Sequence, residues 1–289
     1  MSDTVQRTLR DHVAGWHPAP IVETDILDPA QASRLAATLD TGETFGPEDA
    51  LPIPWHWVYF SEWPPTADLG ADGHPADGHF LPPIPDRRRM FAGSRITSTG
   101  PLRLGVPTEK RSSIAAITEK TGRTGDMLFV TVRSEYRQDG DDEPRLVEEQ
   151  NLVYRSDSGH SRPFERPSSE LGASTAQWST EPTPTTPTLF RYSALTSNAH
   201  RIHYDRPYVT EVEGYPDLVV HGPLLATYMA ELVRSRRGGE SLRDFEFRLQ
   251  RPLFIGDRFR VEATDTGGDI ALRVVTGGDT VHVSGRGSF

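Results

Sequence analysis

The sequence predicts an α+β protein built from two copies of one unit, each a helix followed by an antiparallel sheet. Three observations carry this prediction. The chain has 289 residues, enough for two domains of roughly 140 residues each. Apolar residues alternate with a period of two between residues 91 and 155, and again after residue 244, as in half-buried strands. A Pro-Leu-x-x-Gly turn occurs in each half, at Pro101 and at Pro252.

Composition narrows the class of protein. Hydrophobic content of 35%, with 25% charged residues, 25 Gly and 24 Pro, is typical of a globular protein with long loops. The formal net charge of -10 argues against a nucleic-acid partner, because duplex binding needs clustered cations. The chain has no cysteine, which excludes disulfides, thiolate metal sites and a thiol nucleophile. Without an apolar leader or an uninterrupted apolar span, we expect a cytoplasmic protein and no membrane contact.

The first predicted domain covers residues 1–155. Asp28 as N-cap, Pro29 at the first helical position and Gly42 as a stop predict a helix. The segment Trp55–Phe60 is strand-like, and residues 62–88 form a loop rich in Pro, Gly, Asp and His. Three further strands complete the sheet: Ile114–Glu119, Met127–Tyr136 and Leu146–Tyr154.

The second predicted domain covers residues 188–289, after a linker at residues 156–187 that is rich in Ser, Thr and Pro. Gly222 as N-cap and Pro223 begin an apolar helix. Four strands follow: Asp244–Gln250, Arg258–Thr264, Ile270–Thr276 and Val281–Gly285. A sheet wrapped around one apolar helix is the hotdog arrangement, so the matched turns and element order predict a double hotdog.

Three residues in the second half have the side chains or backbone groups for chemistry at a carbonyl compound. Asn198 and His203 lie five residues apart, upstream of the helix that Gly222 leads. An imidazole that titrates near neutrality can deprotonate a water held beside a carboxamide. Unpaired N–H groups at a helix start can polarise a carbonyl oxygen. This set predicts the movement of water across a double bond next to a carbonyl.

The segments RYSALTSNAHRIHYD, Arg191–Asp205, and VVHGPLL, residues 219–225, closely resemble the MaoC-like hydratase and dehydratase family. The nearest likeness is to its double-hotdog subgroup, which contains mesaconyl-C4-CoA hydratase and the mitochondrial-type 3-hydroxyacyl-thioester dehydratase. The resemblance implies that His203 is the catalytic acid and base and that the N–H of Gly222 binds the thioester oxygen. Asn198 stands where many members carry aspartate, and an amide orients water rather than accepting a proton. The first domain has no counterpart of these residues and, by resemblance, supplies surface for the acyl chain.

Three functions are consistent with this resemblance. The first is hydration of a short branched or dicarboxylic enoyl-CoA of the mesaconyl-C4-CoA type. The second is dehydration of a 3-hydroxyacyl group on acyl carrier protein, in fatty acid or polyketide assembly. The third is a non-catalytic scaffold that binds acyl thioesters, which the retained His203 disfavours. The resemblance also implies a homodimer, and we expect no cofactor beyond the acyl thioester itself.

Other histidines and arginines have more ordinary interpretations. His74 and His79 in the loop 62–88 could bind a metal with Asp72 and Asp77, but no thiolate or helical spacing supports it, so we expect no metal and a mobile loop or lid. His221 is expected to cap its helix or to satisfy the core rather than to contact the substrate, and His200 to face away from the site or cap a turn. We expect Trp55 and Trp57 to pack in the core. Three basic runs could bind an anionic ligand, although such runs are usually solvated: Arg87–Arg89; Arg103 with Lys110 and Arg111; and Arg234 with Arg236 and Arg237.

Overall fold

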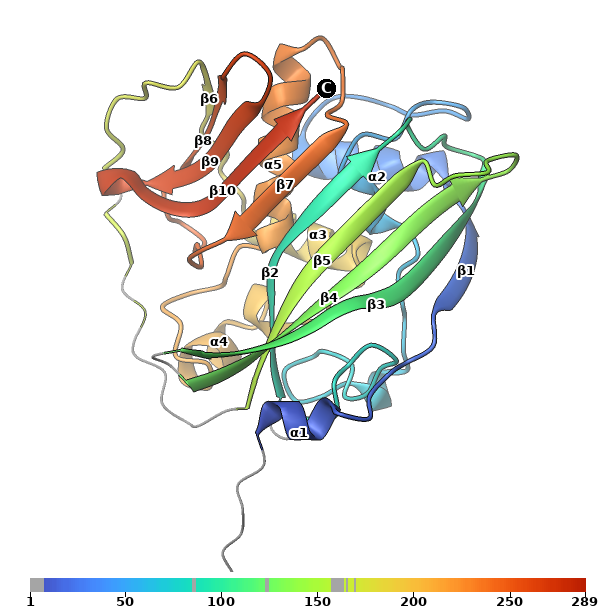
Figure 1. Cartoon of the computed structure of the whole chain (residues 1–289). Helices are drawn as coiled ribbons and strands as arrows, with labels where there is room; N and C mark the ends of the chain where they lie inside the picture. The colour runs from blue at the N-terminus through green and yellow to red at the C-terminus, as the bar shows by residue number, and fades with distance from the viewer. Residues whose placement is uncertain (1–7, 85–86, 123–124, 157–163, 165, 169) are drawn as a thin grey trace, which may run out of the picture.

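The structure is a computed structural model that describes residues 8–84, 87–122, 125–156, 164, 166–168 and 170–289. Within these residues the strands form one ten-stranded antiparallel sheet in the order β1-β3-β4-β5-β2-β7-β10-β9-β8-β6. The two halves of the sheet meet where the blue-green β2 lies beside the orange β7 (Figure 1). The helices lie mainly on one side of this sheet, which confirms the predicted α+β double hotdog.

Both halves repeat one strand order. If the five strands of each half are numbered along the chain, their order from the outer edge of the sheet to its middle is 1-3-4-5-2 in both halves. The two copies meet at their second strands, β2 and β7. The first-half strands are β1 (Ile21–Ile26), β2 (Arg87–Ser98), β3 (Pro107–Gly122), β4 (Gly125–Gln138) and β5 (Leu146–Ser156). The second-half strands are β6 (Trp178–Thr180), β7 (Asp244–Leu249), β8 (Arg260–Asp265), β9 (Ile270–Thr276) and β10 (Thr280–Ser288). The repeated order confirms the predicted duplication.

The repeated Pro-Leu-x-x-Gly turn has the same backbone in both halves. Gly105 has φ 78° and Gly256 has φ 82°, a left-handed conformation that glycine adopts without a steric penalty. The turn joins the second and third strands of each copy. The sequence match therefore reflects one structural requirement that both copies have kept.

The helices are α1 (Leu9–Val13), α2 (Pro29–Leu39), α3 (Thr186–Leu195), α4 (Arg206–Glu211) and α5 (Gly222–Arg236). Helix α2 begins as predicted, with Asp28 accepting the N–H of Ala30 at 2.9 Å. It ends at Leu39 because Asp40 adopts φ 56°, so the predicted stop at Gly42 is two residues late. The N-cap of α5 is His221 rather than Gly222, which is the first helical residue.

The predicted strand Trp55–Phe60 is wrong. The chain forms a 3-10 helix, η1, at Trp55–Val58. Trp55 and His56 are adjacent and both buried, whereas a strand with one solvent face would bury alternate residues. The indole of Trp55 donates to Glu231 on α5 at 2.9 Å, so tertiary contacts fix this turn.

Hydrogen bonds show which positions of the two halves correspond. Leu51 N–H donates to Leu102 O, and Val220 N–H donates to Leu253 O, both at 2.8 Å. Leu102 and Leu253 are the equivalent residues of the repeated turn. Counting forward from Leu51 and from Val220, Ile53-Pro54 corresponds to Gly222-Pro223. The short η1 therefore lies where α5 begins in the second half, and the loop 62–84 follows it.

The predicted linker at residues 156–187 includes two regular elements. Strand β6 pairs with β8, and α3 begins at Thr186. A three-residue strand in a Ser- and Thr-rich stretch leaves no detectable period in the sequence. Residues 157–163, 165 and 169 of this linker lie outside the described residues. The domain boundaries at residues 155 and 188 stay a prediction.

A single large core runs through both halves, with a smaller one beneath α1. Helix α5 is buried along most of its length against the second-half strands, as Figure 1 shows. The halves are also tied by Arg234 of α5, which pairs with Glu43 and Glu231. Among the helices that the structure describes, none has the length and apolar character to cross a membrane.

Candidate active site

His203 ends a short 3-10 helix, η3 (Arg201–His203), that follows α3. Its Nδ1 lies 2.7 Å from the carbonyl oxygen of Val219, so Nδ1–H is the donor and the lone pair remains on Nε2. The side chain is buried, and this burial lowers the pKa of His203 to about 3. The ring is therefore neutral at pH 7 and can accept a proton at Nε2.

His221 lies against this ring. The two imidazoles are stacked with centroids 3.6 Å apart and planes 18° from parallel. His221 Nε2 lies 2.8 Å from Ser193 Oγ, and burial holds the pKa of His221 well below its usual value. His221 is the N-cap residue of α5, but its side chain forms no capping bond. Instead, its ring supports the orientation of His203.

Gly222 is the first residue of the fifteen-residue helix α5. Because Pro223 has no N–H, the first free donors of the helix belong to Gly222 and Leu224. A Cβ at residue 222 would lie 2.2 Å from Cδ1 of Leu249, so only glycine fits without displacing that side chain. Gly222 adjoins the His221 ring that stacks on His203, so the helix start and the base lie together.

Asn198 lies in the turn between α3 and η3. Its backbone N–H donates to Ser193 O at 2.9 Å, and its Oδ1 accepts the N–H of His200 at 3.0 Å. This fixes the orientation of the amide, and its NH2 group remains to hold a water oxygen. Ser193, which sequence reasoning missed, therefore bonds to both Asn198 and His221. Its place in the conspicuous segment Arg191–Asp205 was the one available signal.

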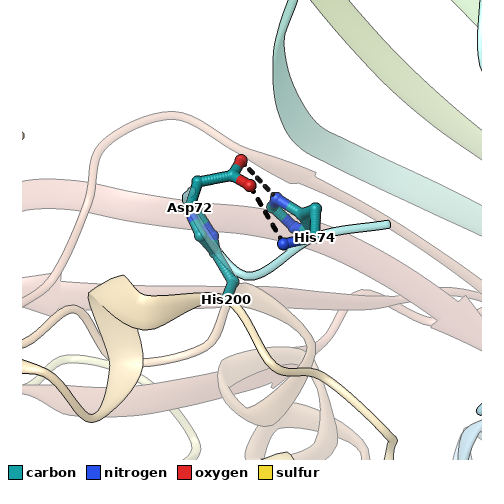
Figure 2. Close-up of side chains that lie close together, drawn as sticks. All are labelled: Asp72, His74 and His200. Atoms are coloured by element: carbon teal, nitrogen blue, oxygen red, sulfur yellow. Dashed lines mark hydrogen bonds and ion pairs between the residues drawn. The ribbon is translucent and has the colours of Figure 1, made fainter. Parts of the chain in front are cut away.

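Residues of the first-half loop approach the same histidines. Figure 2 shows His74 and His200 beside the carboxylate of Asp72. Asp72 Oδ2 lies 2.9 Å from His74 Nδ1, and the rings of His74 and His200 have centroids 4.0 Å apart. The His200 ring in turn lies edge-on to His203, with centroids 5.6 Å apart. His200 thus faces the site rather than away from it. It is also the N-cap residue of η3, as the alternative expectation of a turn cap had it, although its side chain forms no capping bond.

Charge and burial set the protonation of this cluster. Burial lowers the pKa of His200 to about 3, so it is neutral at pH 7. Burial alone would raise the pKa of Asp72, but the hydrogen bonds and electrostatic interactions with His74 and His200 together outweigh burial and lower the pKa to about 2. Asp72 is therefore a carboxylate anion at neutral pH, paired with His74.

Backbone contacts hold the loop against the segment that carries His203. Arg201 N–H donates to Asp72 O at 2.8 Å. Gly73 has φ 90°, and a Cβ there would lie 2.0 Å from Ala199 O, so the close approach requires glycine. These contacts place residues 72–74 directly over residues 199–201. The expected lid is therefore seated on the segment that carries His203.

The predicted metal ligands are only partly brought together. His79 is turned away and contacts Ala19 O at 2.6 Å. Asp72, His74 and His200 offer ligand atoms within 4.8 Å of one another, although Asp72 already holds His74 Nδ1. The expected absence of a metal stays a prediction.

Trp55 and Trp57 lie in or against the core, as expected. Trp55 is almost fully buried, and the indole of Trp57 donates to Glu148 at 2.8 Å.

The fold is that of MaoC-like dehydratases. The MaoC-like dehydratase of Phytophthora capsici superposes with a TM-score of 0.62 at 13% identity, covering 96% of this chain and 98% of that chain. A second MaoC-like dehydratase reaches a TM-score of 0.68 at 12% identity and covers 97% and 99%. These identities establish the fold alone.

Sequence comparison then defines the family. Residues 54–255 match the hydroxyacyl-thioester dehydratase type 2 family. The chain is 45% identical to mesaconyl-C4-CoA hydratase of Chloroflexus aurantiacus, over 87% of this chain and 88% of that protein. It is 29% identical to the mitochondrial hydroxyacyl-thioester dehydratase type 2 of Schizosaccharomyces pombe, over 93% and 98%. The chain belongs to this family, and it is an enzyme of the hydro-lyase class.

Proposed function

We propose that this enzyme adds water to the double bond of a short branched or dicarboxylic enoyl-CoA, of the mesaconyl-C4-CoA type. The observation that carries the reaction is a buried, neutral His203 set beside the N-terminus of α5, whose Nε2 forms no hydrogen bond to any described residue. The relative that is 45% identical supports the substrate class, because its name specifies mesaconyl-C4-CoA.

The proposed mechanism follows from where charge develops. His203 Nε2 takes a proton from a water that the NH2 group of Asn198 orients, and the resulting hydroxide adds to the β-carbon. The negative charge moves to the thioester oxygen, where the N–H of Gly222 and the positive end of α5 stabilise it. The proton on His203 then passes to the α-carbon, which closes the cycle. Dehydration follows the same steps in reverse.

A second candidate substrate is a 3-hydroxyacyl group on acyl carrier protein. It is supported by the family match over residues 54–255 and by the name of the Schizosaccharomyces pombe relative. The reaction at His203 and Gly222 would be the same. The two candidates differ in the carrier and the acyl chain, so substrate preference separates them.

The test is a substrate panel. Loss of enoyl absorbance is followed at neutral pH with mesaconyl-C4-CoA, crotonyl-CoA and a long-chain enoyl-CoA, and dehydration with a 3-hydroxyacyl carrier protein. We expect the highest kcat/KM for mesaconyl-C4-CoA and no turnover in His203→Ala. His17→Ala, at an exposed position, is the matched control and should keep full activity. A clear preference for the carrier-protein substrate would reject the CoA proposal in favour of the second candidate.

We further propose that the enzyme is a cytoplasmic homodimer that needs no bound cofactor. Strand β1 is an edge strand with exposed Val22 and Ile26, a surface suited to pairing with a second copy. Light scattering should give twice the chain mass of 32.1 kDa. Dialysis against a chelator should leave kcat unchanged, whereas a loss that one metal restores would reject the proposed absence of a cofactor.

A further inference from the structure

The mechanism leaves unused a cation and a hydroxyl that face each other on the first-half sheet. Arg89 on β2 is directly opposite Tyr154 on β5 in the strand register, so both side chains lie on the same face. Phe91 follows Arg89 on β2 and packs against Trp57 and Phe247, with ring centroids 6.5 and 5.8 Å away. Tyr154 itself is fully buried. This face of the sheet is therefore the one turned toward the interior.

Neither group has a polar partner among the described residues. The Tyr154 hydroxyl is buried and forms no hydrogen bond within the described part of the chain. Arg89 is half-buried and has no hydrogen bond or ion pair to any residue that the structure describes. A buried hydroxyl left unpaired is destabilising, and a cation taken out of water needs an anion. These groups therefore lack what a bound anion would supply.

The neighbouring arginines of the same run are already engaged. Arg87 donates to Pro82 O at 2.9 Å and to Ala76 O, so it fixes the loop. Arg88 lies 3.5 Å from a carboxylate oxygen of Glu213. Of the run Arg87–Arg89, which the sequence marked as a possible anion site, Arg89 alone is left for a ligand among the described contacts.

Arg89 also lies within electrostatic reach of the active site. Burial raises the pKa of Tyr154, and the charge of Arg89 opposes that rise. The same charge makes the smallest contribution to the lowered pKa of His200, which burial lowers most. The centroid of the His200 ring is 5.6 Å from that of the His203 ring. An anion held by Arg89 would offset this contribution at His200, beside the proposed base.

We propose that Arg89 and Tyr154 bind the free carboxylate of a dicarboxylic enoyl thioester. The inference rests on the proposed function and narrows its substrate to acyl groups that bear an anionic second carboxyl group near the double bond. A guanidinium accepts a carboxylate through two parallel N–H bonds, and the phenol adds a third donor. A neutral acyl group would leave both groups unpaired, so the site would favour an acyl group with a carboxylate over a neutral one.

Two variants test this subsite against two substrates. Arg89→Met removes the charge, and Tyr154→Phe removes one buried oxygen and keeps the ring. Each is assayed with mesaconyl-C4-CoA, which bears the carboxylate, and with crotonyl-CoA, which does not. Arg95→Met, at an exposed position of the same strand, is the matched control. We expect Arg89→Met to lower kcat/KM about 100-fold or more for the dicarboxylic substrate only, and Tyr154→Phe about tenfold.

Each other outcome has a defined meaning. Equal losses on both substrates, or no loss on either, would overturn the carboxylate site, and Arg89 would then be structural. A wild type that hydrates crotonyl-CoA but not mesaconyl-C4-CoA would overturn this inference while leaving the hydratase reaction in place. If Arg89→Met unfolds, Tyr154→Phe decides the question, because loss of one hydroxyl preserves the packing of the ring.

Discussion

The two halves share one strand order but differ at the residue that begins the central helix. In the second half, Gly222 leads the fifteen residues of α5, and its N–H is available to a substrate oxygen. In the first half the equivalent residue is Ile53, whose N–H is taken by Ser241 Oγ at 3.0 Å. The four-residue η1 follows in place of a long helix. The second half thus leaves this N–H for the proposed oxyanion site, whereas the equivalent N–H of the first half is already bonded.

This difference shows how the two copies of a duplicated fold can take different roles. Without a long central helix, the first half has space for the loop 62–84, which reaches across to the second half. Its Asp72 and His74 meet His200 there, and Arg89 of the first-half sheet faces the same interior. We propose that the second half supplies the chemistry, while the first half supplies a cover and the carboxylate subsite.

The largest expected effect is at His203, the proposed acid and base, which the second half carries. Replacing it with glutamine keeps the approximate shape but removes the proton acceptor, so kcat should fall about 100- to 10,000-fold. The change is measured by initial rates on the preferred enoyl thioester. Retention of more than a tenth of the wild-type kcat in a folded variant would mean that another group is the base.

Paired substitutions at equivalent positions test the assignment of the oxyanion site. Gly222→Ala places a methyl group against Leu249 and shifts the helix start, so kcat should fall about 100-fold. Ile53→Val at the equivalent residue shortens one buried side chain and should cost only about 1 kcal/mol of stability. Equal losses of kcat in both variants would contradict the division of roles between the halves.

A smaller effect is expected from the loop that crosses between the halves. Asp72→Asn weakens the hold on His74 beside His200, and we expect kcat to fall about tenfold through loss of positioning. The control is Asp77→Asn, an exposed residue of the same loop. If both variants behave like the wild type at all pH values, the loop contact has no part in the reaction.

The smallest effect concerns stability and pH. The pKa of His203 is lowered in the folded state to about 3, whereas the unfolded chain takes up the proton near pH 6.5. Stability is therefore lost as pH falls from about 6.5 toward 3, by up to about 1.4 kcal/mol per pH unit for this histidine. The free energy of unfolding, measured with urea at several pH values, should fall less steeply with decreasing pH in His203→Gln than in the wild type. An unchanged slope would contradict a neutral, buried imidazole.

Much of this site could be predicted from local sequence. His203, Asn198 and Gly222 lie within one segment of 25 residues. The dipeptide Gly222-Pro223 is by itself enough to predict the start of a helix. The contact of Asp72 and His74 with His200 could not be predicted in this way. It depends on a loop more than 120 residues away, whose path Gly73 fixes by one close contact. The turn at Trp55 was misjudged for a related reason, since its conformation is set by a bond to Glu231 in the other half.

The most direct test of the proposed hydration measures the incorporation of oxygen from water into the product. Wild-type enzyme is incubated with mesaconyl-C4-CoA in water enriched in oxygen-18, and the products are analysed by mass spectrometry. We predict an intact thioester carrying one oxygen-18 as a hydroxyl on the β-carbon. Unchanged substrate, or oxygen-18 only in a released acid, would contradict a hydratase acting through His203 on this thioester.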